Sequence, residues 1–152
     1  MVHALEEIHR LLKPTGRLFD IHPVSESMPV EIHRGGRIVP VGELSVRQWC
    51  TDFQQADDSL TEVTQRGLFI VEDEGVFESP TYYGSVEEMR TALRGSIDRF
   101  ARDAESADEA TRRVEELAAR SEELMRVALD PAELVARERT HIRRLRPVYG
   151  RA

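Results

Sequence analysis

The spacing of apolar residues at the start of the chain predicts a helix followed by a strand. In residues 2–13 the apolar side chains fall on one helical face and the charged side chains on the other. Pro14 and Gly16 are expected to end this helix. Residues 17–21 are largely apolar and predict a short buried strand, so this segment is typical of an α/β unit.

Two later segments have the strand–turn–strand pattern of β-hairpins. The first covers residues 30–41, where two adjacent glycines can adopt the positive φ angles of a tight turn. Pro40 has no N–H to donate to a sheet ladder, so this hairpin is expected at a sheet edge. The second covers residues 68–83, with strands 68–71 and 76–83 on either side of an Asp-Glu-Gly turn.

Apolar residues three and four positions apart predict four more helices, and the chain is expected to be helical from Ser85 onward. Ser45 with Gln48, and Ser85 with Glu88, have the capping-box spacing that favours a helix N-terminus. The expected helices cover residues 45–67, 85–100, 106–128 and 130–147.

Charge is unevenly distributed over the last two predicted helices. Residues 105–123 are rich in acidic side chains, whereas residues 137–151 are rich in arginine. We expect the two helices to form an antiparallel hairpin with surface ion pairs, each worth roughly 0–1 kcal/mol. In the alternative interpretation, the acidic helix of one subunit meets the basic helix of another.

Composition and charge restrict the class of protein. The chain has 152 residues, 40% hydrophobic and 32% charged, which is enough apolar material for one globular domain. A formal net charge of −7 argues against a nucleic-acid binder and against binding to an anionic membrane. Cys50 is the single cysteine, so neither a disulfide framework nor a cysteine-based zinc cluster is expected. The sequence has no bilayer-spanning apolar run and no signal-peptide pattern, so a cytoplasmic location is expected.

Residues 4–23, ALEEIHRLLKPTGRLFDIHP, resemble the segment that follows the fourth strand of class I S-adenosylmethionine-dependent methyltransferases. In that family a helix of the form aL.E..RvLkPgG precedes the fifth strand of the sheet. Thr15 stands where the family more often has glycine. The strand after Gly67 and the stretch 77–89 also look like the last two strands of such enzymes and an accompanying helix. The resemblance covers about residues 1–93.

The resemblance implies the carboxyl-terminal half of a methyltransferase fold without its cofactor-binding half. The family's glycine-rich loop and its ribose-binding acidic residue precede the helix at which this sequence begins, and no Gly-x-Gly-x-Gly occurs in it. A shortened gene or a misplaced start codon would produce such a sequence. S-adenosylmethionine is therefore implied by the resemblance alone, and no cofactor is expected to bind this chain by itself.

The expected fold class is α+β, a partial methyltransferase-like, Rossmann-derived mixed sheet with hairpins, followed by a helical C-terminal tail. Residues 1–103 are expected to form the half-domain. Residues 104–147 are expected to form a helical hairpin that packs on it or on a partner, and residues 148–152 a short tail.

A few side chains are candidates for chemistry, although no nucleophile, base and acid come together in the sequence. His22 is expected at the end of the first strand, where α/β folds place ligands, so it is a candidate general base or substrate contact. Asp20 precedes it by two positions. With His22, Trp49, Tyr82 and Tyr83 are candidates for lining a substrate pocket, although packing between sheet and helices also explains aromatic residues. No histidine, cysteine or carboxylate spacing matches a metal motif, so no metal ligand is predicted.

Three functions are compatible with these patterns. The first is a non-catalytic, oligomeric binding or scaffold module, in which a homodimer mate or a complementary chain covers residues 2–21. The second is a fragment or subunit of an active methyltransferase that acts on an unknown small molecule. The third is a regulatory protein that binds a small ligand between the hairpin 30–41 and the long helix after it.

Overall fold

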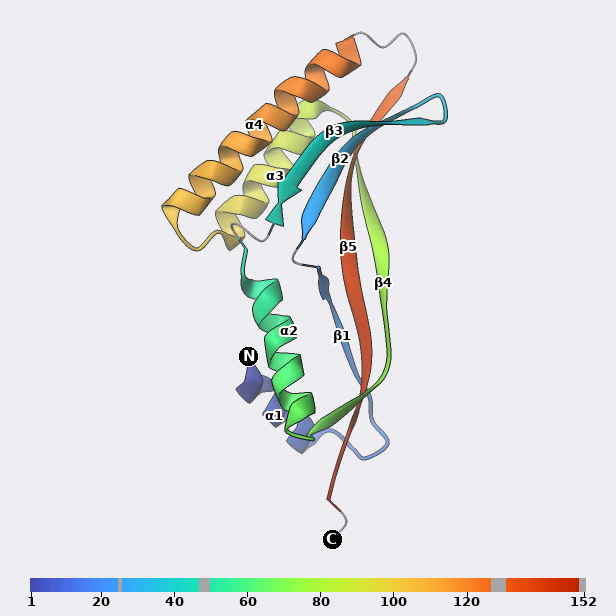
Figure 1. Ribbon diagram of the computed structural model, residues 1–152, viewed down its shortest axis with the longest axis vertical. Helices are drawn as coiled ribbons and strands as arrows, with labels where there is room; N and C mark the ends of the chain where they lie inside the picture. The colour runs from blue at the N-terminus through green and yellow to red at the C-terminus, as the bar shows by residue number, and fades with distance from the viewer. Residues whose placement is uncertain (25, 47–49, 127–130, 151–152) are drawn as a thin grey trace. The chain divides into compact units, whose positions relative to one another are not determined.

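The computed structural model describes residues 1–24, 26–46, 50–126 and 131–150. This part of the chain has an α+β fold with four helices and a five-stranded, mostly antiparallel sheet (Figure 1). The elements are α1 (Val2–Leu11), β1 (Leu18–Pro23), β2 (Ser27–Arg34), β3 (Arg37–Ser45), α2 (Asp52–Gln65), β4 (Phe69–Tyr83), α3 (Val86–Phe100), α4 (Ala104–Arg126) and β5 (Ala132–Pro147).

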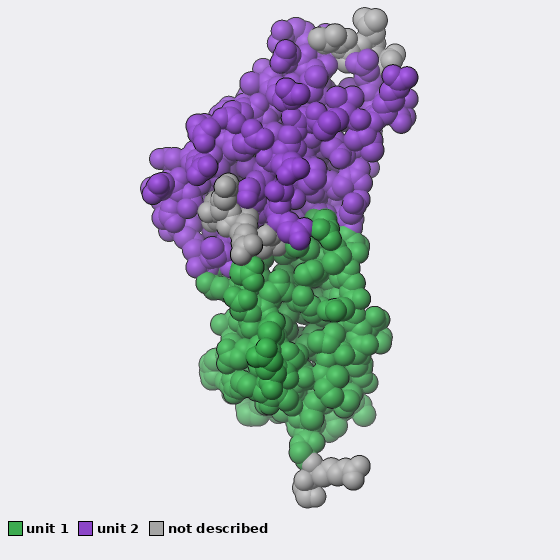
Figure 2. All heavy atoms as spheres, viewed as in Figure 1, with its two compact units in different colours: residues 1–24, 52–77, 139–152 green, residues 25–51, 78–138 purple. Residues whose placement is uncertain are grey.

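The chain divides into two compact units, each made of segments that are distant in the sequence (Figure 2). Unit 1 contains residues 1–24, 52–77 and 139–152, and unit 2 contains residues 25–51 and 78–138. The long strands β4 and β5 each contribute residues to both units.

In unit 1, α1 and α2 cover one face of the strands β1 and β5. The two strands are antiparallel, and their register runs from Leu18 opposite Leu145 to Pro23 opposite Thr140. Apolar side chains from both helices, β4 and β5 pack together beneath the helices, where removing them from water supplies most of the driving force for folding. This core consists of Leu5, Leu60, Val63, Phe69 and Leu145.

Gly67 ends α2 as the sequence indicates. It has a φ of 74°, and its N–H donates to the carbonyl of Thr64 at 3.0 Å. The N–H of Leu68 donates to the carbonyl of Val63 at 3.0 Å, which completes a Schellman motif. Leu68 packs against the core of unit 1, so this cap also directs the chain into β4.

In unit 2, α3 and α4 pack together, and α4 also contacts β2 and β3 (Figure 1). Gly35 and Gly36 form the turn between β2 and β3 with φ angles of 52° and 74°, as expected for this hairpin. The first half of β5 pairs with β2, whereas β3 lies at the end of the strand order, which confirms the edge position inferred from Pro40. The fully buried side chains of this unit include Val30, Leu44, Met89, Ile97, Val114, Leu117, Leu134 and Val135.

The hairpin predicted over residues 68–83 is wrong, because β4 is one continuous strand through the Asp73-Glu74-Gly75 segment and Pro80. β4 pairs with β5, and that pairing satisfies backbone groups that a turn would otherwise have to satisfy. The local turn signal is therefore overridden by a long-range partner. This correction also removes the two separate strands on which the later part of the methyltransferase resemblance depended.

The helix predicted over residues 130–147 is also wrong, because Ala132–Pro147 form the strand β5. Residues 104–147 are consequently one helix and one strand, instead of a helical hairpin, and the expected helical C-terminal tail is absent from the described residues. Since β5 pairs with β1, β2 and β4, its hydrogen bonding to three other strands outweighs the helical spacing of its apolar residues. Asp130, where this helix was expected to begin, lies outside the described residues.

Acidic side chains of α4 form ion pairs with arginines of α3. Glu115 of α4 is 3.1 Å from Arg90 and 3.5 Å from Arg94 of α3, and Glu122 is 3.1 Å from Arg90. The acidic face of α4 therefore pairs with α3.

The N-terminus of α2 differs from the sequence prediction. Ser45 ends β3, Gln48 lies outside the described residues, and α2 begins at Asp52. Ser85 does cap α3, since its hydroxyl accepts from the N–H of Glu88 at 3.1 Å.

No helix in the described ranges is long and apolar enough to cross a membrane.

Candidate functional site

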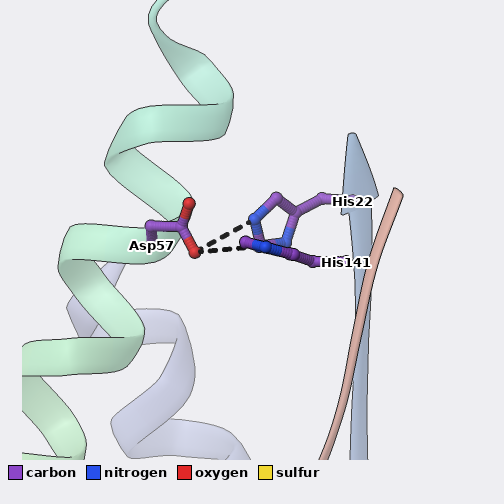
Figure 3. Close-up of side chains that lie close together, drawn as sticks. All are labelled: His22, Asp57 and His141. Carbon is purple, nitrogen blue, oxygen red and sulfur yellow. Dashed lines mark ion pairs between the residues drawn. The ribbon is translucent and has the colours of Figure 1, made fainter. Parts of the chain in front are cut away.

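A group of polar side chains lies between the sheet and α2 in unit 1. Residues two apart in a strand share a face, so Asp20 and His22 of β1 point the same way, as do His141 and Arg143 of β5. The antiparallel register places His22 directly opposite His141, and Asp20 opposite Arg143. Asp57 reaches this face from α2 (Figure 3). We call these five residues the polar cluster.

Asp57 is the centre of the polar cluster. Its Oδ1 lies 3.4 Å from His22 Nε2, 3.6 Å from His141 Nδ1 and 2.5 Å from Arg143 Nη1, which donates a hydrogen bond to it. The two imidazole rings are 5.8 Å apart between centroids and nearly perpendicular. One carboxylate oxygen therefore faces three nitrogen-bearing side chains from two neighbouring strands.

His22 is buried, with 8% of its surface exposed, and its polar atoms are poorly satisfied. Its Nδ1 lies 2.9 Å from Asp20 Oδ2, but the two atoms are not aligned for a hydrogen bond. Among the described residues, neither ring nitrogen of His22 has a hydrogen-bond partner. Such atoms are uncommon in folded proteins because leaving them unpaired costs free energy.

The charges of the cluster keep Asp57 ionised. Burial raises the pKa of Asp57, but the hydrogen bond and positive charge of Arg143 outweigh burial, and the pKa lies below its ordinary value. Arg143 also approaches Asp20 at 3.8 Å and Glu74 at 3.5 Å. Three carboxylates thus surround one guanidinium, which leaves two excess negative charges when the histidines are neutral.

A hollow adjoins the polar cluster on the side of β4. Its volume is about 420 Å³, and it is lined by Glu74, Gly75, Val76, His141 and Arg143. Small molecules and water can therefore approach His141 and Arg143, whereas His22 lies deeper. The arrangement is chemically suited to proton transfer by an imidazole or to binding a cation between imidazole and carboxylate groups.

Of the predicted site residues, His22 and Asp20 belong to unit 1, whereas Tyr82 and Tyr83 belong to unit 2. His22 and Asp20 lie together, within the polar cluster. Tyr82 is 57% exposed and belongs to unit 2 with Tyr83, whose pKa is raised by burial and by nearby carboxylates. Trp49 lies outside the described residues.

Sequence reasoning missed Asp57, His141 and Arg143 as partners of His22. Asp57 follows His22 by 35 residues, and His141 follows Asp57 by 84, so no short motif links them. The helix predicted over 130–147 concealed the alternation that places His141 and Arg143 on one face of a strand. The alternation of residues along 139–145 could have indicated a strand with His141 and Arg143 on one face. That this strand pairs with β1 is known only from the tertiary structure.

A separate hollow lies beside the β2–β3 hairpin in unit 2. It has a volume of about 260 Å³ and is lined by Ile32, Arg34, Arg37, Val39 and Leu124. Leu124 belongs to α4, so α4 is the helix that lines this hollow. The ligand cleft expected from the sequence is a different one, between the hairpin 30–41 and the helix predicted over residues 45–67.

Comparisons of the chain with protein-family models, with curated proteins and with solved structures found no significant match.

Proposed function

We propose that this chain is a methyltransferase-like half-domain that acts as a non-catalytic binding module, and that it binds a partner through β1. The observation that carries the proposal is the position of β1 at the end of the strand order, where the described residues leave its second edge unpaired. An unpaired strand edge presents backbone N–H and C=O groups that another chain can bind. The helix–turn–strand formed by α1 and β1 agrees with the segment that carries the methyltransferase resemblance.

The outer face of β1, opposite the polar cluster, adds an apolar surface to this edge. Phe19 and Ile21 are each 58% exposed. A hollow of about 270 Å³ lies on this face, between Phe19 and Ile142, with Asp73 and Arg144 also lining it. Adjacent large apolar side chains at an open strand edge are typical of a surface that is covered by a partner.

A second copy of the chain is the partner that this surface fits best. The edge of this apolar surface has both positively and negatively charged side chains, since Arg144 lies 3.5 Å from Glu72 and 3.9 Å from Asp73. A two-fold arrangement places the same surface on both subunits, so that positive and negative side chains on one can face their opposites on the other. Symmetric pairing can therefore cover the apolar centre and bring Arg144 of each subunit close to the acidic side chains of the other.

The oligomeric state tests this proposal. We expect light scattering after size-exclusion chromatography to give twice the mass of the chain, and Ile21→Glu to give the monomer mass. Ile38→Glu is a matched control, because Ile38 is 57% exposed on β3 in unit 2, and it should remain a dimer. A monomer for the unmodified chain across micromolar concentrations contradicts the proposal, as does a dimer that Ile21→Glu leaves intact.

A part in an active S-adenosylmethionine-dependent methyltransferase is the second candidate function. Its support is the polar cluster, where the buried His22 beside two carboxylates is a chemically plausible general base. Calorimetric titration of S-adenosylmethionine tests the non-catalytic candidate, because saturable binding would contradict it. No binding is expected for the non-catalytic module, whereas saturable binding by these 152 residues favours the enzyme.

A further inference from the structure

We propose that His22, Asp57 and His141 bind a divalent transition-metal ion such as Zn²⁺. This site lies on the inner face of β1 and β5, so it does not depend on the partner surface proposed above. Two imidazole nitrogens and one carboxylate oxygen are typical ligands of Zn²⁺ and neighbouring first-row metals, whereas Mg²⁺ and Ca²⁺ prefer oxygen ligands throughout.

The distances between the three ligand atoms are close to those of a zinc site. Tetrahedral bonds of about 2.0–2.1 Å place neighbouring ligand atoms about 3.3 Å apart. The carboxylate oxygen of Asp57 lies 3.4 Å from His22 Nε2 and 3.6 Å from His141 Nδ1, and all three atoms lie within 4.8 Å of one another. The distance between the imidazole nitrogens can shorten by rotation of the rings, without movement of the strands.

His22 provides an independent indication that an ion belongs here. Its ring is more than nine-tenths buried, and both ring nitrogens lack hydrogen-bond partners among the described residues. Binding a metal through Nε2 would satisfy one of them. Asp20 Oδ2, 2.9 Å from Nδ1, is placed to accept the proton on the other nitrogen once the ring turns slightly. A carboxylate behind a metal-binding histidine is a common way of fixing its orientation.

His141 already presents a lone pair on the nitrogen that faces Asp57. Arg143 Nη2 lies 3.1 Å from His141 Nδ1 in hydrogen-bonding geometry. A guanidinium can only donate, so Nδ1 must be the acceptor and carry no proton. The ligand form of His141 is therefore the form that Arg143 selects.

Arg143 occupies the position of the cation in the metal-free cluster. Its guanidinium contacts both Asp57 and His141, and a metal ion must displace it from them. Glu74 offers an alternative partner, because its Oε2 is 3.5 Å from Arg143 Nε and its side chain is 68% exposed. The carboxylates of Asp20, Asp57 and Glu74 and the guanidinium of Arg143 together carry a net charge of −2, which a divalent cation would neutralise.

Three protein ligands leave at least one coordination position for water or another small ligand. Sites of this kind are characteristic of catalytic metals, whereas structural zinc sites usually have four protein ligands. The hollow of about 420 Å³ beside His141 and Arg143 gives access from that side. The geometry therefore points to an open metal site rather than a structural one.

Titration of the untagged full chain, freed of metal with a chelator, tests the proposal. We expect calorimetry to show one Zn²⁺ per chain, and Co²⁺ to produce visible absorption bands of a low-symmetry site. His22→Ala and His141→Ala should each abolish saturable binding. His33→Ala is the matched control, because His33 lies 3.0 Å from Glu31 in unit 2 and should not affect binding.

Two further variants keep all three ligands and report on the surrounding charges. Asp20→Asn should weaken Zn²⁺ binding about 10- to 100-fold, the range found when a carboxylate behind a ligating histidine is lost. Arg143→Gln should tighten it about tenfold or more, because the competing positive charge is removed.

The proposal is overturned by an unmodified chain that binds neither Zn²⁺ nor Co²⁺ saturably, by binding that survives His22→Ala, or by weaker binding in Arg143→Gln. Circular dichroism identifies any variant that fails to fold. If a histidine variant does so, the opposite effects expected for Asp20→Asn and Arg143→Gln decide the question.

Discussion

Replacement of Leu145 by alanine tests how the core of unit 1 holds its two helices against the sheet. Leu145 is fully buried in β5, where it packs with residues of α1, α2 and β4. It lies opposite Leu18 in the β1–β5 register and two positions from Arg143, so it also adjoins the polar cluster. Leu145→Ala therefore removes part of a side chain that packs against α1, α2 and β4 at once.

The expected loss in the free energy of unfolding is about 3 kcal/mol. Leucine-to-alanine changes in protein cores cost about 2–5 kcal/mol, because buried apolar surface is lost and a cavity remains. The Leu145 site is surrounded by two helices and two strands, which limits collapse into the cavity and argues against the lower end of that range. For a chain of this length the change corresponds to a fall of roughly 6–12 °C in Tm.

Urea denaturation followed by far-ultraviolet circular dichroism measures this change. Leu11→Ala is the control, since Leu11 is a leucine of α1 that is 70% exposed and should lose less than about 0.5 kcal/mol. A loss below about 1 kcal/mol for Leu145→Ala, or equal losses for the two variants, would refute the packing described for unit 1.

Three other substitutions have expected outcomes that stability measurements can check. Gly67→Ala should destabilise the chain by about 1–2 kcal/mol, because its φ of 74° is unfavourable for other residues, and thermal unfolding should show a lower Tm. Gly95→Ala should instead raise the Tm, corresponding to about 0.5–1 kcal/mol, because Gly95 lies within α3 and an added Cβ meets nothing within 4 Å. The pKa of Glu31 lies below its ordinary value because of hydrogen bonds from His33 and Arg137, despite burial. The ionised Glu31 carboxylate therefore stabilises the folded chain above the unfolded-state pKa of about 4.3, and this contribution is lost as the pH falls below that value. Glu31→Gln removes the titrating group. Denaturation measured between pH 6 and pH 3 should therefore show a smaller acid-induced loss of stability for this variant.

Much of the secondary structure is predictable from local pattern. The helix at 2–13, the strand at 17–21 and the hairpin at 30–41 correspond to α1, β1 and the β2–β3 pair. Each has an apolar period, a glycine or proline signal, or both, within a few residues of its boundary. Local interactions determine these elements, so the sequence is enough to find them.

The polar cluster could be predicted only in part. His22 at the end of β1 and its neighbour Asp20 were candidates because of their position on a strand. Asp57 had no recognisable role in the sequence, and His141 and Arg143 were assigned to a helix. Their approach to His22 depends on the β1–β5 register and on the packing of α2 over it.

The sequence by itself determined an α+β chain, the α1–β1 unit, the β2–β3 hairpin, the N-cap of α3 and the glycine that ends α2, because each depends on contacts between near neighbours. Only the tertiary structure decided that residues 132–147 form a strand and that 69–83 form one strand instead of two. Strand pairing joins residues more than 100 positions apart, and its hydrogen bonds and side-chain burial outweigh the weak local preferences of these segments. The same pairing places His22 opposite His141, which no local pattern specifies.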